Sequence, residues 1–141
     1  GQAPIIYGHG NQTRCFSYID DCLDCLIPML DQKNLNKEII NIGPDEEFVT
    51  INKIAEICSN ITGINLNPIH KKDRPREVKH ATCSADKARK LLNYETKVSL
   101  SDGVKKTYDY IKKRGPKDFN YRLTIEIDND LTPDTWKNKE I

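Results

Sequence analysis

Two neighbouring segments of this chain are too apolar to lie at a protein surface. Residues 22–29 (CLDCLIPM) carry only Asp24 as a clearly polar side chain, and residues 37–43 (KEIINIG) place three isoleucines within four positions. A helix that is apolar on most sides packs against several partners, and such an isoleucine run is typical of a parallel strand covered on both faces. The chain offers few other strands to flank this one. We therefore predict an α/β fold in which this helix and strand complete a sheet that lies outside the sequence.

Short strands and capped helices are expected along the rest of the chain. The expected strands cover residues 4–7, 13–19, 64–69 and 121–127. The expected N-caps are Asp20 or Asp21, Thr50, Ser84, and Ser99 in a capping box with Asp102. The expected helix ends are Pro28, which should kink or end its helix, Gly63, and Gly115-Pro116.

Charge and composition argue against several classes of partner. The 141 residues hold 22 Lys and Arg against 21 Asp and Glu, so the net charge of +1 gives no reason to expect nucleic acid or an anionic membrane surface. No apolar run approaches the roughly 20 residues of a membrane span. The five cysteines and the absence of a secretion signal indicate reduced thiols and a cytoplasmic protein. The start at Gly1, without methionine, suggests a piece of a longer protein.

The possible metal and catalytic motifs of the chain each have a structural explanation. The pair Cys22 and Cys25 has the CxxC spacing of redox and zinc sites, but no second CxxC or HxxxH accompanies it, so core thiols are favoured. The histidines, at positions 9, 70 and 80, have no spaced partner and are interpreted as surface or turn residues. Asp20 and Asp21 could form an acid–base pair, although capping explains them more simply. No catalytic residue and no metal site are predicted.

Arg14 and Arg74 are the candidate anion-binding residues. A guanidinium presents a rigid fork of donors that matches phosphate oxygens, so two arginines from distant segments could clamp one diphosphate. Gly8 and Gly10 would let the backbone approach a ligand closely. A solvated surface position is the alternative for each arginine, and Tyr7 could belong either to the core or to a nucleobase contact.

Three segments resemble, in order and spacing, one enzyme family over residues 4 to about 114. They are PIIYGHGNQTRCFSYIDD, EIINIG, and DRPREVKHATCSADKARKLLNYETKVSLSDGVKKTYDYI. They resemble the C-terminal half of the extended short-chain dehydrogenase/reductases that act on nucleotide sugars, such as UDP-glucose 4-epimerase. We therefore divide the chain into a nucleotide-sugar-binding portion, residues 1–115, and a C-terminal extension, residues 116–141.

The resemblance implies a role for each candidate residue. Arg14 and Arg74 match the arginines that bind the diphosphate, and Glu77 matches an acid near the ribose hydroxyls. Tyr7 matches the position beside the nucleobase, and Gln12 is assigned to the same substrate site. The NAD-binding glycines and the catalytic Tyr-x-x-x-Lys of the family have no counterpart here, so NAD should be bound by the missing N-terminal half.

The resemblance also leaves alternatives open. Cys15 and His9 stand where the family usually has aspartates, which weakens any assignment to a subfamily. Epimerase, dehydratase and decarboxylase remain open, as do a non-catalytic sugar-nucleotide-binding module and a protein-interaction piece. UDP is the expected nucleotide, a homodimer is possible in the family, and the chain alone should be inactive.

Overall fold

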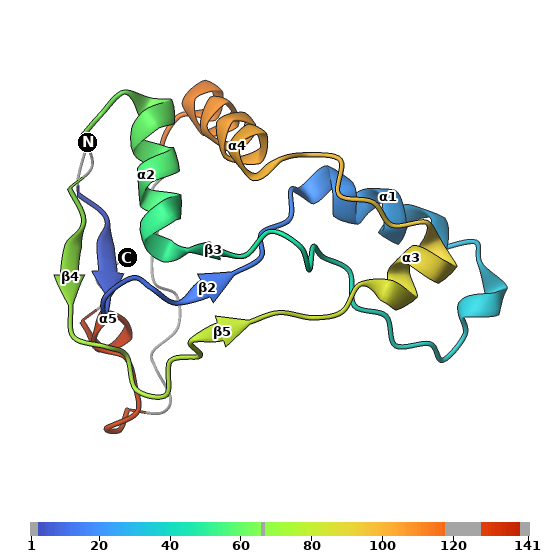
Figure 1. Cartoon of the computed structure of the whole chain (residues 1–141), viewed down its shortest axis with the longest axis horizontal. Coiled ribbons are helices and arrows are strands. Elements are labelled where there is room, and N and C mark those ends of the chain that lie inside the picture. Colours follow the sequence, from blue (N-terminus) through green and yellow to red (C-terminus); the bar gives the residue numbers. More distant parts are fainter. Residues whose placement is uncertain (1–2, 66, 118–127, 139–141) are drawn as a thin grey trace.

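A computed structural model describes residues 3–65, 67–117 and 128–138 (Figure 1). The strands are β1 (Ile5–Tyr7), β2 (Thr13–Arg14), β3 (Val49–Thr50), β4 (Ile69–Lys71) and β5 (His80–Ala81). The helices are α1 (Ile19–Met29), α2 (Ile51–Thr62), α3 (Asp86–Leu92), α4 (Leu100–Arg114) and α5 (Asp134–Lys137), with a 3-10 turn at Lys33–Leu35. This mixture of helices and small sheets confirms the predicted α/β class.

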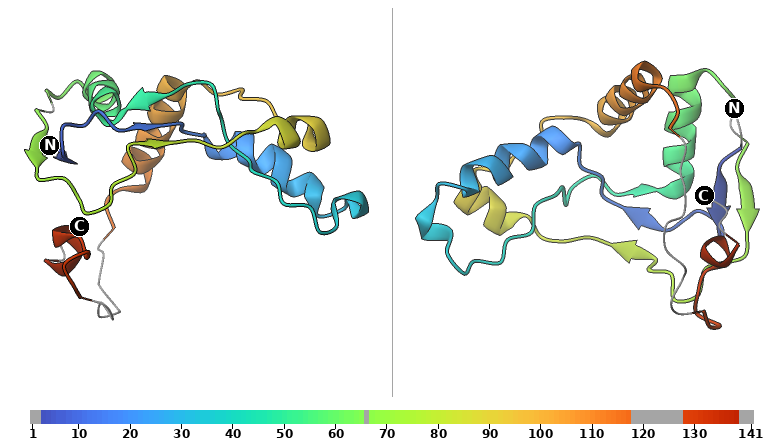
Figure 2. Two further views of the ribbon diagram at one scale, coloured as in Figure 1. Left: turned by 60° about the horizontal axis from the view of Figure 1, so that its bottom comes forward. Right: turned by 180° about the vertical axis from the view of Figure 1, so that it is seen from behind.

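The molecule is elongated, with a strand-rich end and a helical arm (Figures 1 and 2). At the strand-rich end, β1 pairs with β4 in parallel, while β2 pairs antiparallel with β3 and parallel with β5. Helices α2 and α4 pack together beside these sheets. Helices α1 and α3 pack together in the arm, which extends away from the strands.

The strand predictions were right in position for residues 4–7 and wrong in extent elsewhere. β2 covers only Thr13–Arg14 of the predicted 13–19. β4 begins at Ile69, where the predicted 64–69 strand should have ended, because Pro68 has no backbone N–H to give to a ladder. The predicted strand 121–127 lies outside the described residues.

The isoleucine run at 39–42 is not a strand in this structure. Residues 38–42 have no assigned strand, and within the described part of the chain no strand lies beside them to pair with. Ile39 is 87% exposed, whereas Ile40 and Ile42 pack against the core of the arm. A ladder needs a second strand, so the segment forms no strand within the described chain, and its pairing with a sheet outside this sequence stays a prediction.

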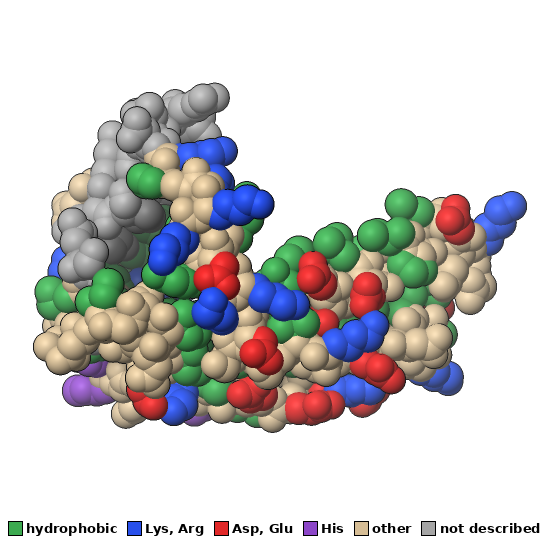
Figure 3. All heavy atoms as spheres, turned by 90° about the horizontal axis from the view of Figure 1, so that it is seen from above, with side chains coloured by type: hydrophobic (Ala, Val, Ile, Leu, Met, Phe, Trp, Pro, Cys, Tyr) green, Lys and Arg blue, Asp and Glu red, His purple; other side chains and the backbone are tan. Residues whose placement is uncertain are grey.

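Helix α1 has one buried face and one exposed apolar face. Its Cys25 joins Leu35 and residues of α3 and the following loop in a buried cluster: Ala85, Ala88, Leu92 and Tyr94. The opposite face exposes an apolar row: Ile19, Leu23, Leu26, Ile27 and Leu30. Figure 3 shows apolar side chains along this arm. The predicted helix with apolar residues on several sides is therefore present, and its second face is uncovered.

Local capping chemistry explains most helix boundaries. Thr50 accepts a hydrogen bond from the Lys53 N–H at 3.1 Å, and α2 ends at Gly63 in the left-handed conformation, as predicted. Ser99 caps α4 by accepting from the Asp102 N–H at 3.1 Å, and that helix stops at Gly115, also as predicted. α1 ends at Met29, one residue after Pro28.

Two capping predictions were wrong. The N-cap of α1 is Tyr18 rather than Asp20 or Asp21, because the Asp21 carboxylate is buried and accepts from the backbone N–H groups of Lys97 and Val98, each at 3.2 Å. Ser84 lies one residue before the N-cap of α3, although its hydroxyl accepts from the Asp86 N–H at 3.2 Å.

Among the described residues, none of the helices has both the length and the apolar character that crossing a bilayer requires. The cytoplasmic location stays a prediction.

Candidate functional site

The five predicted site residues line one pocket at the strand-rich end. This arginine pocket has a volume of about 330 Å³ and is lined by Tyr7 of β1, Arg14 of β2, Gln12 between them, and Arg74 and Glu77 of the loop after β4. The remaining lining residues are Ile5, Ile6, Ile51 and Trp136. The parallel pairing of β1 with β4, and of β2 with β5, holds both ends of the 72–79 loop against the segment that carries Arg14.

Both candidate arginines meet at the carboxylate of Glu77. Arg14 Nη2 donates to Glu77 Oε1 at 2.9 Å, and Arg74 Nε lies 2.9 Å from Oε2. The second contact is an ion pair without hydrogen-bond alignment, because the Arg74 Nε–H has no acceptor in line with it among the described residues. The Glu77 side chain is only 11% exposed. The group carries one more positive than negative charge and therefore favours an anion.

With the described residues alone as partners, both guanidiniums have N–H donors left for a further ligand. Arg14 Nη1 donates to the carbonyl oxygen of Thr13 at 2.8 Å, which fixes the plane of its fork. Within the described part of the chain, the Nη groups of Arg74 have no carboxylate or carbonyl partner. A guanidinium has five N–H donors, so each arginine has several N–H groups that these contacts do not use and that could bind a ligand.

Tyr7 and Gln12 are fixed by contacts within the site. The Arg74 guanidinium lies over the Tyr7 ring, 5.3 Å from its centroid. The Tyr7 hydroxyl is buried and has no hydrogen-bond partner among the described residues. Gln12 is buried and its Nε2 donates to the carbonyl oxygen of Tyr7 at 3.1 Å. Gln12 therefore braces the turn between β1 and β2 as well as lining the pocket.

The glycines of this turn make room for protein side chains. Gly8 and Gly10 have φ angles of +71° and +72°, which non-glycine residues rarely adopt. A Cβ on Gly8 would lie 1.8 Å from Asp73 Oδ1, and one on Gly10 would lie 2.1 Å from Asn52 Oδ1. The close approach predicted for a ligand is thus made in this structure by Asp73 and Asn52.

Trp136 is an aromatic lining residue that the sequence analysis did not assign to the site. It comes from α5, in the segment set apart as a C-terminal extension. No spacing or motif joins it to residues 7–77. Its being the only tryptophan was the sole signal that singled it out.

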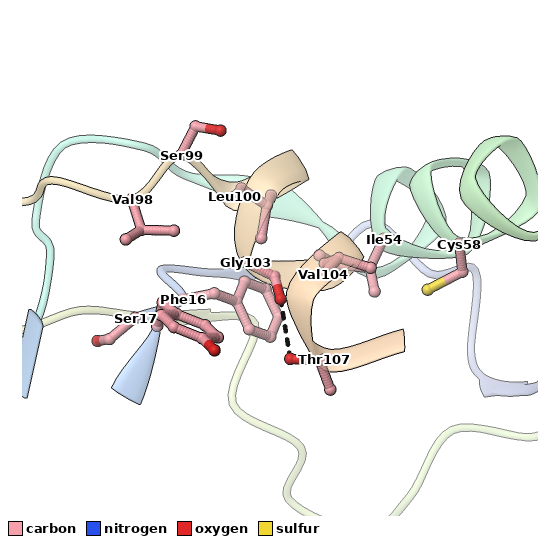
Figure 4. A pocket seen from close by; sticks show the side chains of 11 residues that line it. Phe16, Ser17, Ile54, Cys58, Val98, Ser99, Leu100, Gly103, Val104 and Thr107 are labelled. Atoms are coloured by element: carbon pink, nitrogen blue, oxygen red, sulfur yellow. Dashed lines mark hydrogen bonds between the residues drawn. The ribbon is translucent and has the colours of Figure 1, made fainter. Parts of the chain in front are cut away.

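A second pocket, of about 290 Å³, has no charged side chain in its wall (Figure 4). It lies between α2, α4 and the segment from β2 to α1, and its walls include Phe16, Ile54, Leu100 and Val104. The Thr107 hydroxyl is satisfied by the Gly103 carbonyl oxygen at 2.8 Å. Because a diphosphate needs cationic or N–H donors, this pocket does not suit one.

A second arginine cluster lies in the arm. Arg89 pairs with the carboxylates of Asp45, Glu46 and Asp86. Hydrogen bonds from Arg89, with one from the Ala85 N–H, lower the pKa of Asp45 from 3.8 to about 2. The same hydrogen bond to Asp45 raises the pKa of Arg89 above its usual range.

Cys15 and Cys25 do not have reactive thiolates, and the described residues form no metal site. Burial raises the pKa of the Cys15 and Cys25 thiols above the ordinary 9.0, so both are protonated near neutral pH. Cys15 follows Arg14 directly and therefore supplies no negative charge beside it. In the part of the chain that the structure describes, no group of three His, Cys, Asp or Glu residues could hold a metal ion.

Comparison with known proteins identifies relatives among nucleotide-sugar enzymes. The family model described as GDP-mannose 4,6 dehydratase matches residues 1–107. UDP-glucuronate 4-epimerase of Thermodesulfobacterium geofontis is 36% identical over 113 residues, which are 79% of this chain and 34% of that protein. UDP-N-acetyl-alpha-D-glucosaminuronate decarboxylase of Bacillus cytotoxicus is 29% identical over 119 residues, which are 80% of this chain and 36% of the relative.

Solved structures agree. UDP-glucuronic acid 4-epimerase from Bacillus cereus, in complex with UDP-glucuronic acid and NAD, superposes with a TM-score of 0.72 and 40% identity, over 79% of this chain and 36% of that one. This chain spans about a third of the length of the curated relatives it matches. The predicted boundary between residues 115 and 116 stays a prediction. With a family match over residues 1–107 and the same fold in a related epimerase, the chain belongs to the extended short-chain dehydrogenase/reductases, in the family that includes GDP-mannose 4,6 dehydratase and the UDP-sugar epimerases.

Proposed function

We propose that this chain is the nucleotide-sugar-binding part of an NAD-dependent nucleotide-sugar epimerase and holds the diphosphate through Arg14 and Arg74. The observation that carries the proposal is the meeting of these two arginines at one carboxylate, in a pocket that also contains Tyr7. The related epimerase that binds UDP-glucuronic acid supports UDP as the nucleotide.

Each residue has a chemical task in this proposal. The remaining N–H donors of Arg14 and Arg74 bind diphosphate oxygens from two sides, which fixes the register of the ligand. Glu77 holds both forks in place and can accept hydrogen bonds from ribose hydroxyls. At about 330 Å³ the pocket lies at the lower end of the range for small-molecule sites, about 300–1,000 Å³. It therefore encloses the nucleotide end of the ligand and leaves the sugar to be held elsewhere.

NAD does not fit the described residues of this chain. They contain no glycine-rich loop between a strand and a helix N-terminus of the kind that receives a dinucleotide pyrophosphate. We assign NAD, which accepts and returns a hydride when bound, to the part of the parent protein outside this chain. The arginine pocket contributes by orienting the sugar, because positioning makes a reaction step close to unimolecular.

Two alternatives remain within this site. The whole protein could be a nucleotide-sugar dehydratase or decarboxylase. The similarity to the decarboxylase of Bacillus cytotoxicus supports the decarboxylase as an alternative. The chain could also be a non-catalytic binding module. An assay of the 141-residue chain with NAD and UDP-glucuronic acid should show no turnover, and turnover would contradict the assignment of the catalytic groups to another part of the protein.

Isothermal titration calorimetry with UDP-glucuronic acid tests the clamp. Arg14→Ala and Arg74→Ala should each weaken binding about tenfold or more, because each removes charge-assisted hydrogen bonds. Arg76→Ala is the matched control, since Arg76 is an exposed arginine of the same loop and does not line the pocket. Circular dichroism verifies that each variant is folded. Equal affinity in all four proteins would refute the proposal.

A further inference from the structure

We propose that Trp136, in the C-terminal extension, is the wall of the arginine pocket that stacks on the nucleobase and gives the site its preference for a nucleotide over a bare diphosphate. This inference rests on the function proposed above and adds a residue to it. It assigns the extension a part in ligand recognition.

Trp136 lies on a short helix that follows a hydrogen-bonded turn. Figure 1 shows α5 below the C-terminal end of β1. A turn before it is closed by hydrogen bonds from Leu131 N to Asn129 Oδ1 at 2.8 Å and from Thr132 N to the Asn129 carbonyl oxygen at 3.0 Å. Lys137 pairs with Asp128 at 2.9 Å, which ties the two ends of the element together. These contacts shape the segment that carries the indole, and Trp136 lines the arginine pocket together with Tyr7, Arg14 and Arg74.

The indole of Trp136 has a large solvent-exposed surface. Trp136 is 53% exposed although it is the largest aromatic side chain in the chain. Tyr7, the other aromatic side chain among the described lining residues, has the Arg74 guanidinium over its ring. Trp136 therefore has the aromatic surface on which a ligand ring can stack. A base stacked there would cover apolar area that is now in water.

The chemistry of the pocket selects one class of ligand. Two guanidiniums that share one carboxylate favour a further anion, and an exposed indole in the same pocket favours a flat conjugated ring joined to that anion. A nucleoside diphosphate has both parts in one molecule. Inorganic pyrophosphate has the anion alone, so it separates the contribution of Trp136 from that of the arginines.

Fluorescence can report on this residue directly. Trp136 is the only tryptophan of the 141 residues, so selective indole excitation reads one position. Titration with UDP should change the Trp136 emission until it saturates. The Kd from this titration should equal the Kd from calorimetry. Inorganic pyrophosphate should displace UDP while producing little change of its own.

Substitution of Trp136 measures how much the contact with the base contributes to UDP affinity. Trp136→Ala should weaken UDP binding about 5- to 100-fold and leave pyrophosphate affinity within about twofold of wild type. Trp136→Phe, which keeps an aromatic face, should recover most of the loss. Equal weakening of UDP and pyrophosphate by Trp136→Ala would indicate a structural role and overturn the inference.

Two further results separate this inference from the proposed function. If UDP binds and depends on Arg14, but neither the emission nor the affinity responds to Trp136, the inference fails and the diphosphate clamp stands. If UDP does not bind the wild-type chain, the clamp fails and the base contact fails with it.

Discussion

The molecule contains two arginine–carboxylate clusters with opposite balances of charge. In the arginine pocket, two guanidiniums share the single carboxylate of Glu77. In the arm, the single guanidinium of Arg89 faces three carboxylates. The first cluster has positive charge to spare and the second has two more negative than positive charges. Only the first can be expected to attract a diphosphate.

The comparison shows that neither an arginine–carboxylate cluster nor cavity size by itself identifies an anion-binding site. A polar pocket of about 530 Å³ lies beside Arg89, larger than the arginine pocket of about 330 Å³. Two glutamates, Glu46 and Glu95, line the larger one. The Arg89 cluster instead joins the loop at residue 45 to α3 and so contributes to the fold of the arm. Substitutions in the arm should change stability without changing UDP affinity, whereas those at the arginine pocket should change affinity.

The largest effect on stability is expected at Asp21. Its carboxylate is 2% exposed and accepts two backbone hydrogen bonds, so Asp21→Ala leaves the N–H groups of Lys97 and Val98 without their acceptor. We expect a loss of about 3 kcal/mol in the free energy of unfolding, measured with urea. Asp20→Ala, at the exposed neighbouring position, should stay within about 0.5 kcal/mol. A loss of UDP affinity in the folded Asp21→Ala variant would contradict the prediction that substitutions in the arm change stability alone.

A smaller effect on stability is expected for Gly8→Ala, and this substitution should change both stability and UDP affinity. The φ angle of +71° strains any side chain, and the new Cβ meets Asp73 Oδ1, so we expect a loss of about 2 kcal/mol and weaker UDP binding. Gly63→Ala is matched in φ, at +68°, with nothing within 4 Å. It should cost about 1 kcal/mol and leave UDP affinity unchanged. Equal costs at the two glycines would show that the contact with Asp73 is unimportant.

The smallest effect should come from the partly exposed pair of Asp45 and Arg89, and it should depend on pH. The pKa of Asp45 is lowered from 3.8 to about 2 in the folded chain, so the stabilisation is complete above about pH 4 and lost as the pH falls through 2. Urea midpoints of the wild type and Asp45→Asn should differ at pH 6 and converge between pH 4 and 2. Glu46→Gln, whose carboxylate is 68% exposed, should show a smaller difference at pH 6. A difference that stayed constant with pH would rule out the ion pair as its source.

Features fixed by nearby residues were predictable from the sequence, and features fixed by distant ones were not. The Thr50 and Ser99 caps, and the helix ends at Gly63 and Gly115, depend on hydrogen bonds within one turn. Asp21 has the local pattern of a cap, but its partner lies 76 residues further on.

The same division applies to the candidate site. A resemblance carried by quoted motifs selected Tyr7, Gln12, Arg14, Arg74 and Glu77, which the structure brings into one pocket. Trp136 was missed because no local pattern connects α5 with β1. The isoleucine run at 39–42 was predicted as a strand because its composition suits one, yet pairing depends on a neighbour that composition does not reveal.

The uncovered row on α1 has a practical consequence for handling the chain. Leu30 and Ile27 of this row, which are 85% and 61% exposed, leave aliphatic surface in contact with solvent next to the folded core of the arm. Adhesion between such surfaces strengthens on warming, because apolar hydration becomes less favourable as the temperature rises. Storage should therefore be cold and dilute, and the heating rate and concentration will both affect any melting curve. A partner that covered this row would raise the melting temperature, and the rise would grow with the logarithm of its concentration over its Kd.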